Sequence, residues 1–282
     1  MAIGKPLPRV DAPAKATGRA LYTDDFKRPG VLAAKCFRST IAHGRVKYID
    51  VQAAQALTGV IAVFTYEDVP STPFATAGHP SSLDPNHGDV ADRHILTRDI
   101  RFYGDEIAVV VAEHEAIAQK ALEAIIVEYE IYEALLTPES ILRPGAREIH
   151  KGSQNIVGEH AFECGGDVQR ALQDSDYLIE NDYRTQMVQH CHLENHAVLA
   201  YMEDRDRVTI VTATQIPQIL RRIVGQALNM PWHQIRVLKP HVGGGFGNKQ
   251  DAVLEPLAAF LTTKLGGRAV RISLSREECM SC

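Results

Sequence analysis

Gly243-Gly244-Gly245-Phe246-Gly247-Asn248-Lys249-Gln250 places four glycines within five positions. Glycine has no Cβ, so the main-chain N–H groups of such a loop can approach a ligand closely, and φ > 0 carries no steric cost. A strand-like run at 235–238 precedes the loop, and an apolar, helix-like segment begins at Val253. Because a helix N-terminus attracts negative charge, we expect the loop to bind an anion or an oxo group.

Two common glycine motifs do not fit this stretch. A phosphate-binding P-loop ends in Gly-Lys-Ser/Thr, whereas Asn248 separates Gly247 from Lys249 here, and Gln250 occupies the hydroxyl position. A dinucleotide fingerprint needs glycines at its first, third and sixth positions, and the sixth position from Gly243 is Asn248. A tight strand-to-helix turn without any ligand remains the alternative.

Several stretches agree in order and spacing with one known family. Val242 to Gln250 resembles the Gly-Gly-Gly-Phe-Gly-Gly-Lys motif of the molybdenum-cofactor-binding subunit in the xanthine dehydrogenase / aldehyde oxidase family, of the bacterial xanthine dehydrogenase type. Other stretches that look like this family are 4–25, 101–113, 127–130, 192–196, 214–217 and 274–278. The resemblance covers nearly the whole chain.

The resemblance implies an α+β fold with two parts. A hammerhead-like domain is expected over residues 1–140, and the N-terminal part of a molybdopterin-binding domain over residues 150–282. Pro138, Pro144 and Gly145 break regular structure, so we expect a linker at 138–150. Family subunits continue far beyond the region that matches Glu278. The chain therefore looks truncated: a fragment, a shortened reading frame, or one piece of a split subunit that lacks the family's general base.

Apolar periodicity predicts the individual elements. Strands are expected at 31–37, 60–64, 107–112, 127–132, 177–189, 197–202 and 208–212, where β-prone residues cluster. Helices are expected at 50–57, 115–126 and 217–229, the last with the clearest apolar stripe. Residues 1–20 resemble an extended arm, and 70–92 a long loop.

Composition excludes several classes of protein. The 282 residues are 45% hydrophobic and 23% charged, which suits a globular protein of two modest domains. The net charge of −5 argues against a nucleic-acid partner, because phosphate binding needs a concentrated basic face. No apolar run is long enough to span a membrane, and the N-terminus lacks a signal-peptide core, so we expect a cytoplasmic location.

The five cysteines are scattered, which is not typical of a disulfide framework. No closely spaced four-cysteine run is present, so an iron–sulfur cluster is not expected on this chain. Cys279 and Cys282 form a C-x-x-C pair at the chain end, where we expect little order. One such pair without a second half is a weak signal, and we interpret it as accidental.

Gln215 lies just before the helix predicted at 217–229. Its amide offers both donors and an acceptor, so capping that helix and contacting a ligand are equally open from the residues alone. In the family, the glutamine of the matching Thr-Gln dipeptide donates toward a ligand of the molybdenum. The resemblance therefore implies that role for Gln215.

The resemblance also assigns roles within the glycine loop. Gly245, Phe246 and Gly247 match positions whose backbone amides contact the metal's oxo ligand and the cofactor. Phe246 by itself could equally be a core aromatic or a pocket wall. Gln250 falls where animal-type purine-oxidising enzymes carry a substrate-binding glutamate. Glutamine keeps the hydrogen bonding of that glutamate but loses its charge. The alternative to a substrate-binding role is that Gln250 is simply a solvent-exposed residue.

His190, His192, Glu194 and His196 alternate along the chain. On a strand they would share one face, because the side-chain period is two. Histidine is a common metal ligand, but the spacing matches no standard zinc pattern. A hydrogen-bonded strand that lines an interface or channel is the favoured interpretation.

Together, the resemblance implies the molybdenum subunit of a hydroxylase that oxidises a purine such as hypoxanthine or xanthine, with water as the oxygen source. The metal is held by the molybdopterin, so no protein residue is expected to bind it directly. Electrons would pass to 2Fe-2S and FAD centres on partner subunits, and a missing C-terminal half or a homodimer mate are further candidate partners. Aldehyde oxidation, or a catalytically incomplete assembly module, are the alternatives.

Overall fold

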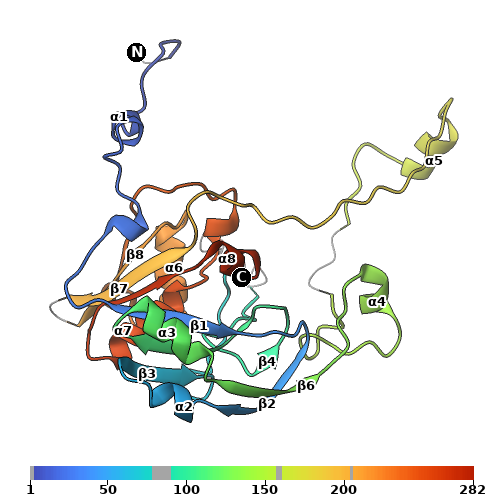
Figure 1. Cartoon of the computed structure of the whole chain (residues 1–282). Helices are drawn as coiled ribbons and strands as arrows, with labels where there is room; N and C mark the ends of the chain where they lie inside the picture. Colours follow the sequence, from blue (N-terminus) through green and yellow to red (C-terminus); the bar gives the residue numbers. More distant parts are fainter. Residues whose placement is uncertain (1–2, 78–89, 157–160, 204–205) are drawn as a thin grey trace. The chain divides into compact units, whose positions relative to one another are not determined.

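The computed structural model describes residues 3–77, 90–156, 161–203 and 206–282. The chain forms two compact units. Unit 1 combines Met1–Ala134 with His190–Cys282, and unit 2 is Leu135–Gln189. Both helices and strands are present in unit 1 (Figure 1), as the expected α+β class requires.

Unit 1 is built on a seven-stranded mixed sheet with the order β3-β5-β1-β10-β7-β8-β9. The β1–β10 and β8–β9 pairs are parallel and the other pairs antiparallel. The strands are β1 (Leu32–Arg38), β3 (Val60–Thr65), β5 (Glu106–Ala112), β7 (Ala197–Glu203), β8 (Arg207–Thr212), β9 (Ile235–Leu238) and β10 (Val270–Ser273). Strands from both sides of the expected division at 140–150 thus join one sheet, with Leu32 opposite Val270. The domain limits stay a prediction.

A smaller antiparallel sheet has the order β4-β2-β6, with strands Asp99–Ile100, Gly44–Asp50 and Ile126–Ile131. Strand β2 lies in a stretch for which the sequence analysis predicts no strand. The helix expected at 50–57 shrinks to α2 (Gln52–Gln55), and the Asp50 carboxylate accepts the backbone N–H of Gln52 at 2.9 Å.

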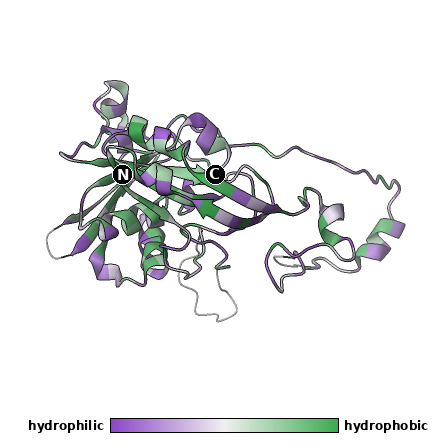
Figure 2. Ribbon diagram, turned by 60° about the horizontal axis from the view of Figure 1, so that its bottom comes forward, coloured by the Kyte–Doolittle hydropathy of each residue, from purple (hydrophilic) through white to green (hydrophobic). Residues whose placement is uncertain are grey.

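Strand β5 decides how the helices are layered, because it is buried on both faces. Val110 and Ala112 pack in the cluster that includes α2 and α3 (Glu115–Leu122). Val109 and Val111 point the other way, into the core shared with α6 (Pro217–Leu228) and α7 (Glu255–Lys264). This alternation follows from the period of two in a strand. Figure 2 shows the hydrophobic residues concentrated along the strands of the sheet.

Helix α6 forms within one residue of its prediction. Pro217 is at the first turn, and the buried Leu220, Ile223, Val224 and Ala227 form the expected apolar stripe. The helix ends at Asn229, which adopts a left-handed conformation with φ 49°. Asparagine tolerates this region better than most residues, so the end is encoded locally.

Two sequence predictions fail in unit 2. The linker expected at 138–150 contains α4 (Pro138–Leu142), which Thr137 caps by accepting the N–H of Ser140 at 3.2 Å. The strand expected at 177–189 does not form: the segment that follows α5 (Val168–Gln173) has no strand assignment and is exposed. A strand needs partners for its backbone N–H and C=O groups, and residues 177–188 pair with no other strand in the described part of the chain.

The two ends of the chain are also more ordered than expected. The N-terminal arm contains α1 (Ala12–Ala16), and the C-terminal stretch forms α8 (Arg276–Met280) with a Ser275/Glu278 capping box. Cys279 is buried in this helix, so the expectation of little order there was wrong. All five cysteines are free. Of the loop expected at 70–92, residues 78–89 lie outside the described residues. No helix in the described ranges has the length and apolar composition needed to cross a bilayer.

Candidate functional site

The glycine loop between β9 and a 3₁₀ turn, η3 (Asn248–Gln250), adopts backbone conformations that few residues tolerate. Gly244 and Gly247 have φ of 96° and 101°, and Phe246 has φ 54°. A non-glycine residue in the left-handed region is uncommon and costs energy. The Phe246 ring is also 74% exposed, so the interpretation of Phe246 as a core aromatic was wrong.

Three successive amides of this loop are unpaired within the described part of the chain. The N–H groups of Gly244, Gly245 and Phe246 donate to no group there, whereas their neighbours Gly243 and Gly247 are both paired. Successive backbone donors in a turn form a concavity suited to anionic or oxo ligands. The donor set therefore fits an oxygen-rich group.

Gln215 reaches this loop from the junction between β8 and α6. Its Oε1 accepts the Gly247 N–H at 3.3 Å, and its own backbone N–H donates to the Lys249 carbonyl at 2.8 Å. A Cβ on Gly245 would lie 2.4 Å from the same Oε1, so any larger residue there would displace the Gln215 side chain or the loop. The helix makes no side-chain cap bond at its N-cap, Ile216, and the capping interpretation of Gln215 was therefore wrong.

The other sequence-predicted site features lie apart from these contacts. Gln250 is exposed at the end of η3, where its N–H donates to the Gly247 carbonyl at 2.9 Å, and its substrate contact stays a prediction. The start of α7 already has an acceptor of its own, so the expected anion site is left to the loop amides. The buried Glu255 at the start of α7 accepts the N–H groups of Val253 and Leu254 with its own carboxylate.

A buried ion pair anchors both ends of the loop, and the sequence analysis did not predict it. The Glu194 Oε2 accepts from Lys249 Nζ and from the Gly243 N–H, each at 2.7 Å. The side chains of Lys249 and Glu194 are only 2% and 14% exposed. The partners are 55 residues apart, so no local spacing could have revealed the pair. It holds the start and the end of the loop to one carboxylate.

The histidine cluster is not a strand face. Cys191 has a left-handed φ of 49°, and β7 begins only at Ala197, so the alternation breaks. Instead, His192 Nδ1 donates to the Glu194 carbonyl at 2.5 Å, and its Nε2 accepts from Asn248 Nδ2 at 3.1 Å. The described residues contain no group of three metal-ligating side chains placed to hold an ion.

His196 makes stability depend on pH. The ring is buried at 7% exposure against His192, and its Nε2 has no partner in the described ranges. Burial, aided by His192 and Lys249, lowers the pKa of His196 from 6.5 to about 3. The unfolded chain therefore binds the extra proton first. Stability is fully present above pH 6.5 and falls toward pH 3 by about 1.4 kcal/mol per pH unit.

We expect the urea midpoint to drop between pH 7 and pH 5, and to drop less in His196→Gln. The exposed His233→Gln is the matched control and should keep the full slope. Equal slopes in both variants would contradict the assignment to His196.

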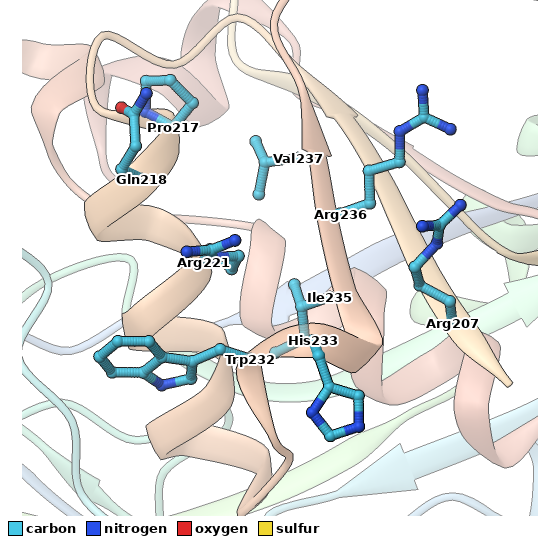
Figure 3. A pocket seen from close by; sticks show the side chains of 9 residues that line it. All are labelled: Arg207, Pro217, Gln218, Arg221, Trp232, His233, Ile235, Arg236 and Val237. Carbon is cyan, nitrogen blue, oxygen red and sulfur yellow. The ribbon is translucent and has the colours of Figure 1, made fainter.

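A separate depression of about 380 Å³ lies between α6, β9 and the 3₁₀ turn η2 (Trp232–Gln234). Figure 3 shows the guanidinium groups of Arg207, Arg221 and Arg236 around it. Glu203 pairs with both Arg207 and Arg236 and offsets part of this charge. None of the sequence-predicted site residues lines this depression.

Two family models match the chain. The aldehyde oxidase and xanthine dehydrogenase a/b hammerhead domain matches residues 17–133, and the molybdopterin cofactor-binding domain matches residues 149–282. The fold thus combines a hammerhead domain with the start of a molybdenum-cofactor-binding domain, as expected. The chain belongs to the xanthine dehydrogenase / aldehyde oxidase family of molybdenum-cofactor-binding proteins.

Individual relatives agree with this assignment. The putative xanthine dehydrogenase molybdenum-binding subunit of Escherichia coli (strain K12) is 52% identical over 271 residues, which are 96% of this chain and 36% of that protein. Quinoline 2-oxidoreductase from Pseudomonas putida 86 matches with a TM-score of 0.83 and 29% identity, over 99% of this chain and 35% of that chain. Aldehyde oxidoreductase from Desulfovibrio gigas matches with a TM-score of 0.87 and 27% identity, over 97% and 30%. The chain thus spans about a third of the length of these relatives.

Proposed function

We propose that this chain supplies one wall of a molybdenum–molybdopterin site in a hydroxylase that oxidises a purine, such as hypoxanthine or xanthine, with water as the oxygen source. The observation that supports it most is the contact between Gln215 and Gly247, beside three unpaired loop amides. Two segments far apart in sequence meet there and present a side-chain amide, backbone N–H groups and the exposed ring of Phe246.

Each residue has a definable task in this proposal. Because its oxygen is engaged by Gly247, the Gln215 side chain has its amide nitrogen left to donate to a ligand oxygen. The amides of Gly245 and Phe246 stabilise negative charge on an oxygen, and need no reorganisation to do so. The pair of Glu194 and Lys249 keeps the loop in place. The bound cofactor would supply the oxidation itself, and the protein supplies orientation and electrostatics.

The choice of substrate depends on the names of the relatives, and the choice of electron partners on the cysteine content of the chain. The E. coli relative is named for xanthine, which supports a purine, whereas the two solved structures are named for quinoline and aldehyde. An exposed, uncharged Gln250 is compatible with any of these substrates. The sequence has no closely spaced four-cysteine run that could hold an iron–sulfur cluster. In line with the family resemblance, we assign the 2Fe-2S and FAD centres to partner subunits.

An assembly module without catalysis of its own is the second candidate, because the chain spans 36% of the E. coli relative. We expect residues 1–282 alone, from a host that makes molybdopterin, to show no turnover of hypoxanthine, xanthine or aldehydes. General-base help typically contributes ~10²–10⁴ in rate, and the resemblance implies that the base is not on this chain.

The decisive experiment adds the part of the E. coli subunit that this chain does not span. Stoichiometric molybdenum in the complex, lost in Gln215→Ala but retained in the exposed Gln218→Ala, would support the enzyme. A complex with no molybdenum in any form would favour the assembly module. Turnover by the chain alone would refute the expectation of inactivity.

A further inference from the structure

The segment 177–189 in unit 2 is an amphipathic strand without a sheet. Its odd positions carry Tyr177, Ile179, Tyr183 and Met187 together with the uncharged polar residues Asn181, Thr185 and Gln189. The even positions carry the three charged residues, Glu180, Asp182 and Arg184, together with Leu178, Gln186 and Val188. Side chains alternate between the two faces of an extended chain, so the odd face carries four large apolar side chains and no charge, whereas the even face carries all three charges. We call the odd face the apolar face. Such a pattern is typical of a strand that covers a core on one side.

The apolar face is bare. Tyr177, Ile179, Tyr183 and Met187 are 90%, 82%, 87% and 99% exposed. The backbone N–H and C=O groups of residues 177–188 have no hydrogen-bond partner in the described part of the chain. The segment is drawn as a plain extended trace between α5 and β7 (Figure 1). An extended segment with an apolar face and unpaired backbone is a template for pairing with another strand.

We infer that this segment is a docking strand that pairs, through its backbone and its apolar face, with a β-strand on the polypeptide that corresponds to the part of the relatives this chain does not span. Two observations select this partner. The segment lies inside the matched molybdopterin cofactor-binding range, 149–282. The E. coli relative, 52% identical, carries nearly two thirds of its length beyond the aligned region.

The charges on the even face determine which face of the segment enters the interface. Arg184 lies 3.7 Å from Glu139, within the same unit, and both side chains are exposed. Burying this face would cost the desolvation of three charges, so the odd face is the one that enters the interface. Main-chain hydrogen bonds then supply affinity, and the alternate apolar side chains supply register. The inference rests on the proposed function only for its choice of partner.

The test uses the full chain, produced together with the remaining part of the E. coli molybdenum-binding subunit. We expect the two polypeptides to copurify, and amide exchange over 177–189 to slow by about a hundredfold or more in the complex. Ile179→Lys and Tyr183→Lys should each reduce copurification by about tenfold. Gln186→Lys adds the same charge to the opposite face and should change copurification less than about twofold.

All three substituted side chains are exposed in the free chain, so its melting temperature should not change and misfolding cannot explain a loss. Equal effects of the odd-face and even-face variants, unchanged exchange in the complex, or no copurification would each overturn the inference. Protection that rises with concentration in the chain alone would also overturn it, in favour of pairing between two copies. Molybdenum content is measured separately: protection without molybdenum contradicts the proposed function alone, and molybdenum without protection contradicts this inference alone.

Discussion

Glu194→Gln is expected to destabilise the folded chain by roughly 3–5 kcal/mol, because it leaves the charge of Lys249 buried and unpaired. Glutamine keeps an acceptor for the Gly243 N–H, so the lost component is the ion pair itself. Lys249→Met combined with Glu194→Gln removes both charges at similar volume. We expect the double variant to be more stable than Glu194→Gln alone, since the unpaired buried charge is gone. Urea denaturation of the two single variants and the double variant measures this coupling.

The exposed pair of Arg45 and Asp99 is the matched control. Its side chains are 47% and 59% exposed at 3.2 Å, and Asp99→Asn should cost less than about 1 kcal/mol. If Glu194→Gln costs no more than Asp99→Asn, the buried pair does not anchor the glycine loop.

Gly245→Ala is expected to separate the loop from Gln215. The new Cβ would lie 2.4 Å from Gln215 Oε1 and 2.9 Å from its Cδ, closer than any real contact, so the side chain or the loop must move. We expect a loss of about 1–3 kcal/mol in stability, the usual cost of overpacking, and faster exchange of the Gly247 amide as its acceptor leaves. In the complex with the remaining part of the E. coli subunit, Gly245→Ala should also lower the molybdenum content.

A second substitution distinguishes crowding from a general intolerance of the loop. Gly245→Ala together with Gln215→Ala removes the obstructing atoms, so stability should recover toward that of Gln215→Ala alone. Molybdenum binding should stay lost, because the proposed ligand contact of Gln215 is absent. A double variant as unstable as Gly245→Ala would show that the clash with Gln215 is not the cause.

Locally periodic elements could be predicted from the sequence. Strand β5 and helix α6 formed within about one residue of expectation. Strand β5 is a short continuous run of apolar, mostly β-branched residues, as a strand buried on both faces requires, and α6 has the apolar period of 3.6. The meeting of Gln215 with the glycine loop was foreseen only through the resemblance of two separate motifs to one family. The residues alone left ligand contact and helix capping equally open.

Elements that depend on a partner could not be predicted. Strand β2 formed where no strand was predicted, because β4 and β6 lie beside it and pair with its backbone. The segment 177–189 has a strand's pattern but forms no strand, since no strand in the described ranges lies beside residues 177–188. The apolar pattern of a segment shows which side chains it could bury. Whether its backbone pairs depends on the strand that the fold places beside it.

The sequence by itself determined the bare loop at 243–247, the helix that follows Gln215 and the buried strand at the centre of unit 1. These depend on steric freedom and on periods that act within a few residues. Only the tertiary structure decided that Glu194 and Lys249 join the two ends of the loop, and that the Gln215 side chain lies against Gly245 where a Cβ would be. The physical reason is that a buried charge or a close approach is set by whatever the fold brings alongside, and spacing along the chain carries no record of it.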